Sequence, residues 1–199
     1  MSVQWVDVRV DDGSFAISDN GEIAAETLDH TNGLIATMDI GAMVSVGIHT
    51  GQVTACASVT AGPPETDDFA EWDEVAEASV YAPYGELRVA TLYFGPVAEL
   101  PVLSSNGPGW YRIRVSARGR DIASSDSTQK DSAERYSLTC WPAPRATSLI
   151  IRATDRTGRG LRASEVKQID APAPSVPASA DPQAELNRQS ILKAMRRPE

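Results

Sequence analysis

The chain has 199 residues, 42% of them hydrophobic and 23% charged, a balance typical of globular proteins that excludes disorder along the whole length. The net charge of −9 is unevenly distributed: residues 1–100 hold seventeen acidic and two basic side chains, whereas residues 101–199 hold ten acidic and sixteen basic ones. No apolar run reaches the ~20 residues of a membrane-spanning helix, and the N-terminus has no signal-peptide pattern, so we expect a cytoplasmic protein without membrane contact.

Apolar and polar residues alternate in many short segments, beginning with Val6, Val8 and Val10. A period of two places apolar side chains on one face of a sheet and polar ones on the other. We therefore expect Tyr111, Ile113 and Val115 to face the core. The strands predicted in this way cover residues 6–10, 44–48, 52–59, 87–89, 111–116 and 136–138.

Glycine-containing turn signals separate these segments, among them Asp12-Gly13, Asn20-Gly21 and Tyr84-Gly85. Glycine supplies the positive φ that tight turns require, and we expect His49–Gln52 to join its two flanking strands as a hairpin. Many short strands and no long helical period predict an all-β fold, an antiparallel β-sandwich or jelly roll. No strand is apolar throughout, which favours antiparallel pairing.

An acidic segment, Asp67–Glu77, follows Gly62-Pro63-Pro64 and Glu65 and contains no basic residue. We expect a polar, exposed loop or single helical turn that leads into a strand. Trp72 lies among the acids, which is typical of an interface anchor with a charged rim. The alternative is that Trp72 turns inward and closes the core while the acids are solvated.

Arg112, Arg114, Arg118 and Arg120 share parity on one predicted strand and its exit, so in a regular strand all four point away from the core. Three targets fit such a row: carboxylates of the acidic half across the sheet, a protein partner, or nucleic-acid phosphates. Cross-strand pairing is favoured, and the net negative charge makes nucleic acid the weakest of the three interpretations.

Candidate catalytic residues are sparse. The histidines, His30 and His49, and the cysteines, Cys56 and Cys140, lie in no recognisable nucleophile motif. Asp29-His30 offers metal-ligating atoms, but without the spacing of a zinc or calcium site, and no nucleotide-binding glycine motif occurs. We predict no cofactor and no metal, and cysteines that are buried and reduced unless adjacent strands bring them together.

Composition changes after Asp170, which predicts three regions. Residues 1–170 form the β domain, residues 171–183 a disordered Pro/Ala-rich linker, and residues 184–199 a basic tail with a short helix.

Several segments resemble a pattern found in uncharacterised actinobacterial β-sandwich proteins. They are residues 109–121 (GWYRIRVSARGRD) and 134–143 (ERYSLTCWPA), together with residues 47–51 and 72–75. The pattern also resembles the competence-nuclease inhibitor group, small β-sandwich proteins that bind and block a nuclease. The resemblance implies an inhibitor or immunity role, and its motifs are structural, so it implies no catalytic residue.

We therefore predict a non-catalytic protein-binding module, of the immunity or nuclease-inhibitor kind, whose acidic surface binds a basic protein partner. The alternative is a small carboxylate-dependent hydrolase or ligand-binding β-sandwich enzyme, which needs a carboxylate held protonated by burial. The residues predicted to bind the partner are Asp67, Asp68, Glu71, Trp72, Asp73, Glu74, Arg112, Arg114 and Arg118.

Overall fold

The computed structural model describes residues 4–64, 69–123, 128–130 and 132–164. All of them belong to one compact unit, Met1–Gln168, and the remaining unit is Ile169–Glu199. The predicted linker, residues 171–183, and the predicted tail helix, residues 184–199, lie outside the described residues.

The described part of the chain is mostly β-strand. Its helices are two short 3-10 turns, η1 (Ala25–Thr27) and η2 (Phe69–Glu71), and one α-helix, α1 (Arg156–Ala163). The strands are β1 (Val6–Val10), β2 (Ser14–Asp19), β3 (Ile35–Thr37), β4 (Ala42–Ser45), β5 (Thr50–Val59), β6 (Glu74–Ala82), β7 (Leu87–Thr91), β8 (Gly95–Pro96), β9 (Gly109–Arg118), β10 (Thr128–Gln129), β11 (Arg135–Pro142) and β12 (Leu149–Ala153).

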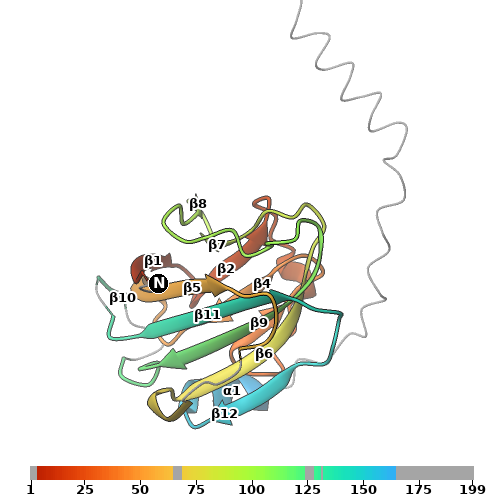
Figure 1. Ribbon diagram of the computed structural model, residues 1–199. Helices are drawn as coiled ribbons and strands as arrows, with labels where there is room; N and C mark the ends of the chain where they lie inside the picture. Colours follow the sequence, from red (N-terminus) through yellow and green to blue (C-terminus); the bar gives the residue numbers. More distant parts are fainter. Residues whose placement is uncertain (1–3, 65–68, 124–127, 131, 165–199) are drawn as a thin grey trace, which may run out of the picture. The chain divides into compact units, whose positions relative to one another are not determined.

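The strands form two sheets (Figure 1). The larger has the order β1-β5-β11-β9-β6-β12, with β10 also paired to β5, and the smaller has the order β3-β4-β2-β7-β8. Most pairs are antiparallel, as predicted. The exceptions are β11 and β10, which run parallel to β5. A strand with alternating apolar and polar side chains can pair with a parallel or an antiparallel neighbour, so the sequence pattern did not reveal the parallel pairing.

The predicted hairpin about His49–Gln52 is wrong, because β4 belongs to the smaller sheet and β5 to the larger one. The connecting residues are held by contacts that are distant in sequence. The Gly47 N–H donates to Glu134 Oε2 at 2.8 Å. A Cβ added at Gly47 would lie 2.0 Å from the Arg120 carbonyl oxygen, so only glycine permits this approach.

One cluster of buried apolar side chains draws residues from both sheets. Tyr111, Ile113 and Val115 are buried in it, which confirms the predicted face of β9. Phe15 of β2 and Tyr136 of β11 meet edge to face, with ring centroids 5.4 Å apart. This aromatic pair joins the two sheets through their shared core.

Both cysteines are buried and free. In the β5–β11 ladder Cys56 lies opposite Ser137, and Cys140 lies opposite Val59, so the two thiols do not face each other. Burial raises the pKa of Cys140 to about 12. As for membranes, no helix within the described ranges has the length and apolar character needed to cross one.

Candidate functional site

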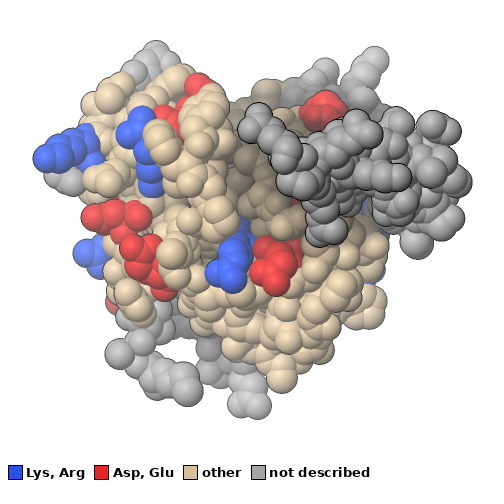
Figure 2. Space-filling view, turned by 90° about the horizontal axis from the view of Figure 1, so that it is seen from above, with Lys and Arg blue, Asp and Glu red and all other residues tan. Residues whose placement is uncertain are grey.

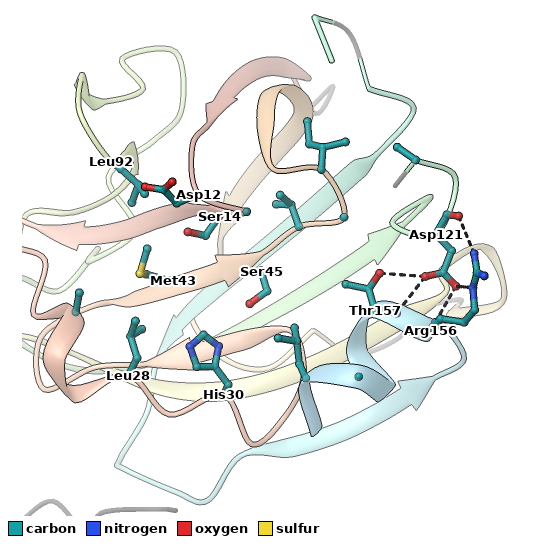
Figure 3. Close-up of a pocket in the computed structure, with 18 residues that line it drawn as sticks. Asp12, Ser14, Leu28, His30, Met43, Ser45, Leu92, Asp121, Arg156 and Thr157 are labelled. Atoms are coloured by element: carbon teal, nitrogen blue, oxygen red, sulfur yellow. Dashed lines mark hydrogen bonds and ion pairs between the residues drawn. The ribbon is translucent and has the colours of Figure 1, made fainter. Parts of the chain in front are cut away.

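A pocket of about 920 Å³ lies on the face of the smaller sheet opposite the shared core. Side chains alternate along β2 and β4, so Phe15 and Val44 enter the core while Ser14, Met43 and Ser45 reach the other face and line the pocket. Figure 3 shows the η1 side of the pocket, with Leu28 and His30, facing the α1 side, with Arg156 and Thr157.

Much of the pocket lining is apolar. Met43 belongs to a second small cluster of buried side chains with Ala36 and Met38, against which Leu28 and Leu92 pack. Val46, Ile48 and Leu161 extend the apolar lining. A largely apolar cavity with a few polar groups is typical of a binding site.

His30 is the most unusual polar residue in this lining. Its Nδ1 atom is buried and has no hydrogen-bond partner among the described residues. Burial lowers the pKa of His30, and the nearby Asp29 carboxylate opposes that effect. His30 is therefore neutral at pH 7, with its ring directed into the pocket (Figure 3).

The N-terminus of α1 is capped by carboxylates on the other side of the pocket. Asp121 accepts hydrogen bonds from the backbone N–H groups of Arg156 at 2.7 Å and Thr157 at 3.1 Å, and Asp155 accepts from Gly158 N–H at 2.7 Å. Burial alone would raise the pKa of Asp121, but the hydrogen bonds from Arg156 and Thr157, together with the Arg156 charge, outweigh it and lower the pKa. The helix terminus thus has no free donor for an external anion.

Two exposed aromatic side chains, Tyr93 and Phe94, form what we call the rim of the pocket. Their exposed fractions are 69% and 71%. The Tyr93 hydroxyl donates to Asp12 Oδ2 at 2.8 Å, and both Asp12 and Leu92 line the pocket. The Arg9 guanidinium lies 5.3 Å from the centroid of the Phe94 ring. These contacts hold two large apolar surfaces in solvent beside the pocket.

A largely buried ion cluster fixes α1 as a wall of the pocket. Arg120 donates from Nε and Nη2 to the Asp155 carboxylate at 2.6 and 2.9 Å. Its Nη1 donates to the carbonyl oxygens of Gly33 and Ser45, both at 3.1 Å. One guanidinium therefore joins the end of β9, the smaller sheet and the N-cap of α1.

Glu74 completes the ion cluster. Its side chain is fully buried, and it accepts a hydrogen bond from Arg162 of α1, while Arg120 Nη2 lies 4.0 Å from its Oε2. Burial raises the pKa of Glu74, and the hydrogen bond from Arg162 opposes that effect. The expectation of an exposed Glu74 is therefore wrong, because this carboxylate is used to attach α1.

The expectation that Arg120 points away from the core with the other three arginines assumed a regular strand and is also wrong. Gly119 adopts a φ of +86°, which ends the regular alternation of β9 and turns the next side chain inward. Arg120 is 1% exposed. It lies beyond the end of β9, where the alternation that relates it to Arg112 and Arg114 no longer predicts the direction of its side chain.

Arg112 and Arg114 pair across the sheet with a carboxylate of the acidic half, which confirms the favoured interpretation. Arg112 Nε donates to Glu77 Oε2 at 3.0 Å, and Arg114 Nε donates to Glu77 Oε1 at 2.8 Å. The Arg114 guanidinium also lies 5.3 Å from the Phe69 ring and 5.7 Å from the Trp141 ring. Both arginines are largely covered.

The other residues predicted to bind the partner make different contacts and do not form one surface among the described residues. Trp72 is half-buried, with Arg118 at 5.6 Å from its ring, and Asp73 accepts the Gly119 N–H at 2.8 Å. Glu71 is exposed. Asp67 and Asp68 lie outside the described residues. On the face in Figure 2, acidic and basic side chains lie beside one another, and no broad acidic patch covers it.

The sequence pattern did not predict the pocket. Its lining residues come from separate turns, from β2 and β4 of the smaller sheet and from α1, which are distant from one another in the sequence. The available signal was the pair Tyr93-Phe94, two large aromatics in a turn before Gly95. Within the described ranges, no group of three or more His, Cys, Asp or Glu side chains is arranged to hold a metal ion.

Comparisons with known proteins add little. No family model matches the chain, and no curated protein matches it. A solved structure described as crocagin biosynthetic gene J aligns at 13% identity over 71% of this chain and 99% of that one, with a TM-score of 0.39. That score is too low to carry an argument about fold or function.

Proposed function

We propose that the chain is a non-catalytic protein-binding module whose binding site is the pocket with its Tyr93–Phe94 rim. The observation that carries the proposal is the exposure of both rim aromatics, 69% and 71%: Tyr93 is hydrogen-bonded to Asp12 of the largely apolar pocket, and Phe94 follows it in the chain. Large aromatics next to a pocket are typical of protein interfaces, where they become buried and contribute most of the affinity.

The pocket supports binding better than catalysis. Its carboxylates have structural roles, because Asp121 caps α1 and Asp12 accepts the Tyr93 hydroxyl. Catalysis by a hydroxyl nucleophile needs a base within hydrogen-bond reach, and His30 makes no hydrogen bond to Ser14 or Ser45. The arrangement therefore favours a partner that fills the pocket over a substrate that reacts there.

Protein binding is also the function predicted from the sequence, but the proposed site is the pocket and its rim and not the acidic segment. Glu74 and Glu77 are buried in ion pairs, so the described part of the acidic segment offers few free carboxylates for a basic partner. We propose further that the two sheets form a sandwich, supported by their shared core. An inhibitor or immunity role is the form of this function that the sequence resemblance implies.

Site-specific cross-linking tests the proposal. A photoreactive phenylalanine analogue replaces Phe94 in one variant and Leu149, a 50% exposed residue on β12, in another. We expect position 94 to give a cross-linked protein in the source cell and position 149 to give none. The cross-linked partner is then purified and titrated against wild type, Phe94→Ser and Leu149→Ser.

The titration decides the outcome. Phe94→Ser should weaken binding at least about 10-fold, as expected for a buried aromatic anchor, and Leu149→Ser should change affinity less than about 2-fold. Equal affinities of wild type and Phe94→Ser would refute the proposed site.

A further inference from the structure

The second inference rests on the proposed function and concerns what enters the pocket. It starts from the two ring nitrogens of His30, which have different surroundings. Nδ1 is enclosed by the protein and has no partner among the described residues. Nε2 is not enclosed in this way, and the ring points into the pocket (Figure 3).

This asymmetry selects the tautomer of the neutral imidazole. A proton on Nδ1 would create a buried N–H without an acceptor, which is costlier and rarer than an unsatisfied acceptor. The proton therefore sits on Nε2, where the pocket is accessible. His30 presents a hydrogen-bond donor to an occupant of the pocket.

The charged groups around the pocket determine which acceptors suit this donor. Asp12 and Asp121 both contribute carboxylates to the lining, so a second carboxylate would meet repulsion. The cation in the lining, Arg156, is already engaged, since it contacts the Asp121 carboxylate at 3.5 Å and the Asp121 carbonyl oxygen at 3.1 Å. The N–H groups at the start of α1 are also satisfied.

We propose that the pocket binds an apolar side chain of the protein partner together with a main-chain carbonyl oxygen, which accepts a hydrogen bond from His30 Nε2–H. The apolar side chain packs on Met43, Leu28 and Leu161. An uncharged carbonyl satisfies the donor without adding charge beside Asp12 and Asp121, and every residue of a partner peptide carries one.

Nuclear magnetic resonance on the full chain tests this with two small probes. N-acetyl-leucine methylamide supplies the leucine side chain and neutral carbonyls, and N-acetyl-leucine supplies the same side chain with a carboxylate. The readouts are the Met43 methyl resonance and a ¹H–¹⁵N spectrum that identifies the protonated nitrogen of His30. We expect the Nε2–H tautomer in the free protein and a shift of both signals on adding the amide.

Two variants separate the hydrogen bond from packing. His30→Phe removes the donor and should weaken binding of the amide about 3- to 10-fold, the effect of one net hydrogen bond. His30→Gln places an amide donor near the position of Nε2 and should restore part of the loss. Thermal unfolding of both variants confirms that they fold.

Three results would overturn the inference: an Nδ1–H tautomer, equal binding of the carboxylate and amide probes, or amide binding unchanged in His30→Phe. If the amide shifts Met43 regardless of residue 30, the carbonyl contact is wrong while the proposed function stands, because the latter depends on Phe94. If neither probe shifts Met43, the occupant is wrong, and the cross-linking at position 94 separately decides the proposed function.

Discussion

At the scale of single residues, the buried arginine at the end of β9 has the largest structural role. The Arg120 side chain is fully enclosed and makes four hydrogen bonds, two to the Asp155 carboxylate and two to carbonyl oxygens. A guanidinium suits this place because its planar fork donates in several directions at once, which an ammonium group cannot do. The arginine stabilises the fold only together with the carboxylates that neutralise it.

We predict that Arg120→Met unfolds with a free energy about 3–5 kcal/mol lower than wild type, because the Asp155 carboxylate then remains buried without its cation, while Glu74 keeps only Arg162. The matched control is Arg118→Met, where the half-exposed guanidinium lies on Trp72 and its loss should cost less than about 1 kcal/mol. Urea denaturation measures both. Similar costs for the two variants would contradict the role assigned to Arg120.

His30 makes stability depend on pH, with a sign that follows from its environment. Burial lowers the pKa of His30 in the folded protein, so below pH 6.5 the unfolded chain binds a proton that the folded chain does not. We predict that wild type loses stability relative to His30→Gln as the pH falls from about 7.5 to about 5.5. Urea midpoints at both values measure the difference, and a constant difference would mean that His30 titrates normally.

The sequence predicted the environment of some charged residues correctly and of others incorrectly. Pairing of Arg112 and Arg114 with a carboxylate of the acidic half followed from parity on a strand and the opposite charges of the two halves, but the sequence did not identify Glu77 as that carboxylate. Arg120 and Glu74 failed because their burial depends on a left-handed Gly119 and on α1, which are tertiary facts. His30 could be placed only on a loop, since its environment comes from distant segments.

At the scale of elements, alternation identified most long strands and the core face of β9. It did not show which sheet each strand joins: β4 and β5 follow each other in the chain but belong to different sheets, and Gly47, between them, lies close to the distant Arg120 backbone. The pattern also missed α1. Gly158 and Gly160 weaken its helical propensity, and its stability comes instead from Asp155 at the N-cap and from the ion cluster.

Gly47 offers a test of the crossing between the sheets. A Cβ there would lie 2.0 Å from the Arg120 carbonyl oxygen, whereas a Cβ at Gly62 meets nothing within 4 Å, and neither glycine has a positive φ. We predict that Gly47→Ala lowers the free energy of unfolding by about 1–3 kcal/mol or more, and that Gly62→Ala changes it by less than about 0.5 kcal/mol. Comparable effects would show that the crossing is loosely packed.

At the scale of the whole molecule, the many short alternating segments correctly indicated a mostly β chain, and the absence of a disulfide agrees with a core sufficient to hold both sheets. The pocket was beyond prediction because it forms where η1, the smaller sheet and α1 converge. Tertiary packing brings these elements together, and the local periodicity of a sequence indicates secondary structure without showing which elements pack against each other.

The oxidation state of the two thiols can be tested on the intact protein. Cys56 and Cys140 are buried and unpaired, and burial raises the pKa of Cys140 to about 12. We predict that the native protein resists alkylation near pH 8, that urea exposes both thiols, and that a reductant leaves the melting temperature unchanged. Mass spectrometry after alkylation measures this. A shift of the melting temperature with reductant would reveal a disulfide.

If the pocket and its rim bind a protein, they should also bind short peptides that carry the same anchor, and the affinity of selected peptides measures this. A displayed random-peptide library is selected on wild type, and the enriched peptides are titrated against wild type, Met43→Glu, Phe94→Ser and Leu149→Ser. We expect peptides with an apolar anchor that bind Met43→Glu and Phe94→Ser at least about 10-fold more weakly than wild type and Leu149→Ser. Peptides that bind Met43→Glu and Phe94→Ser as tightly as wild type would contradict it.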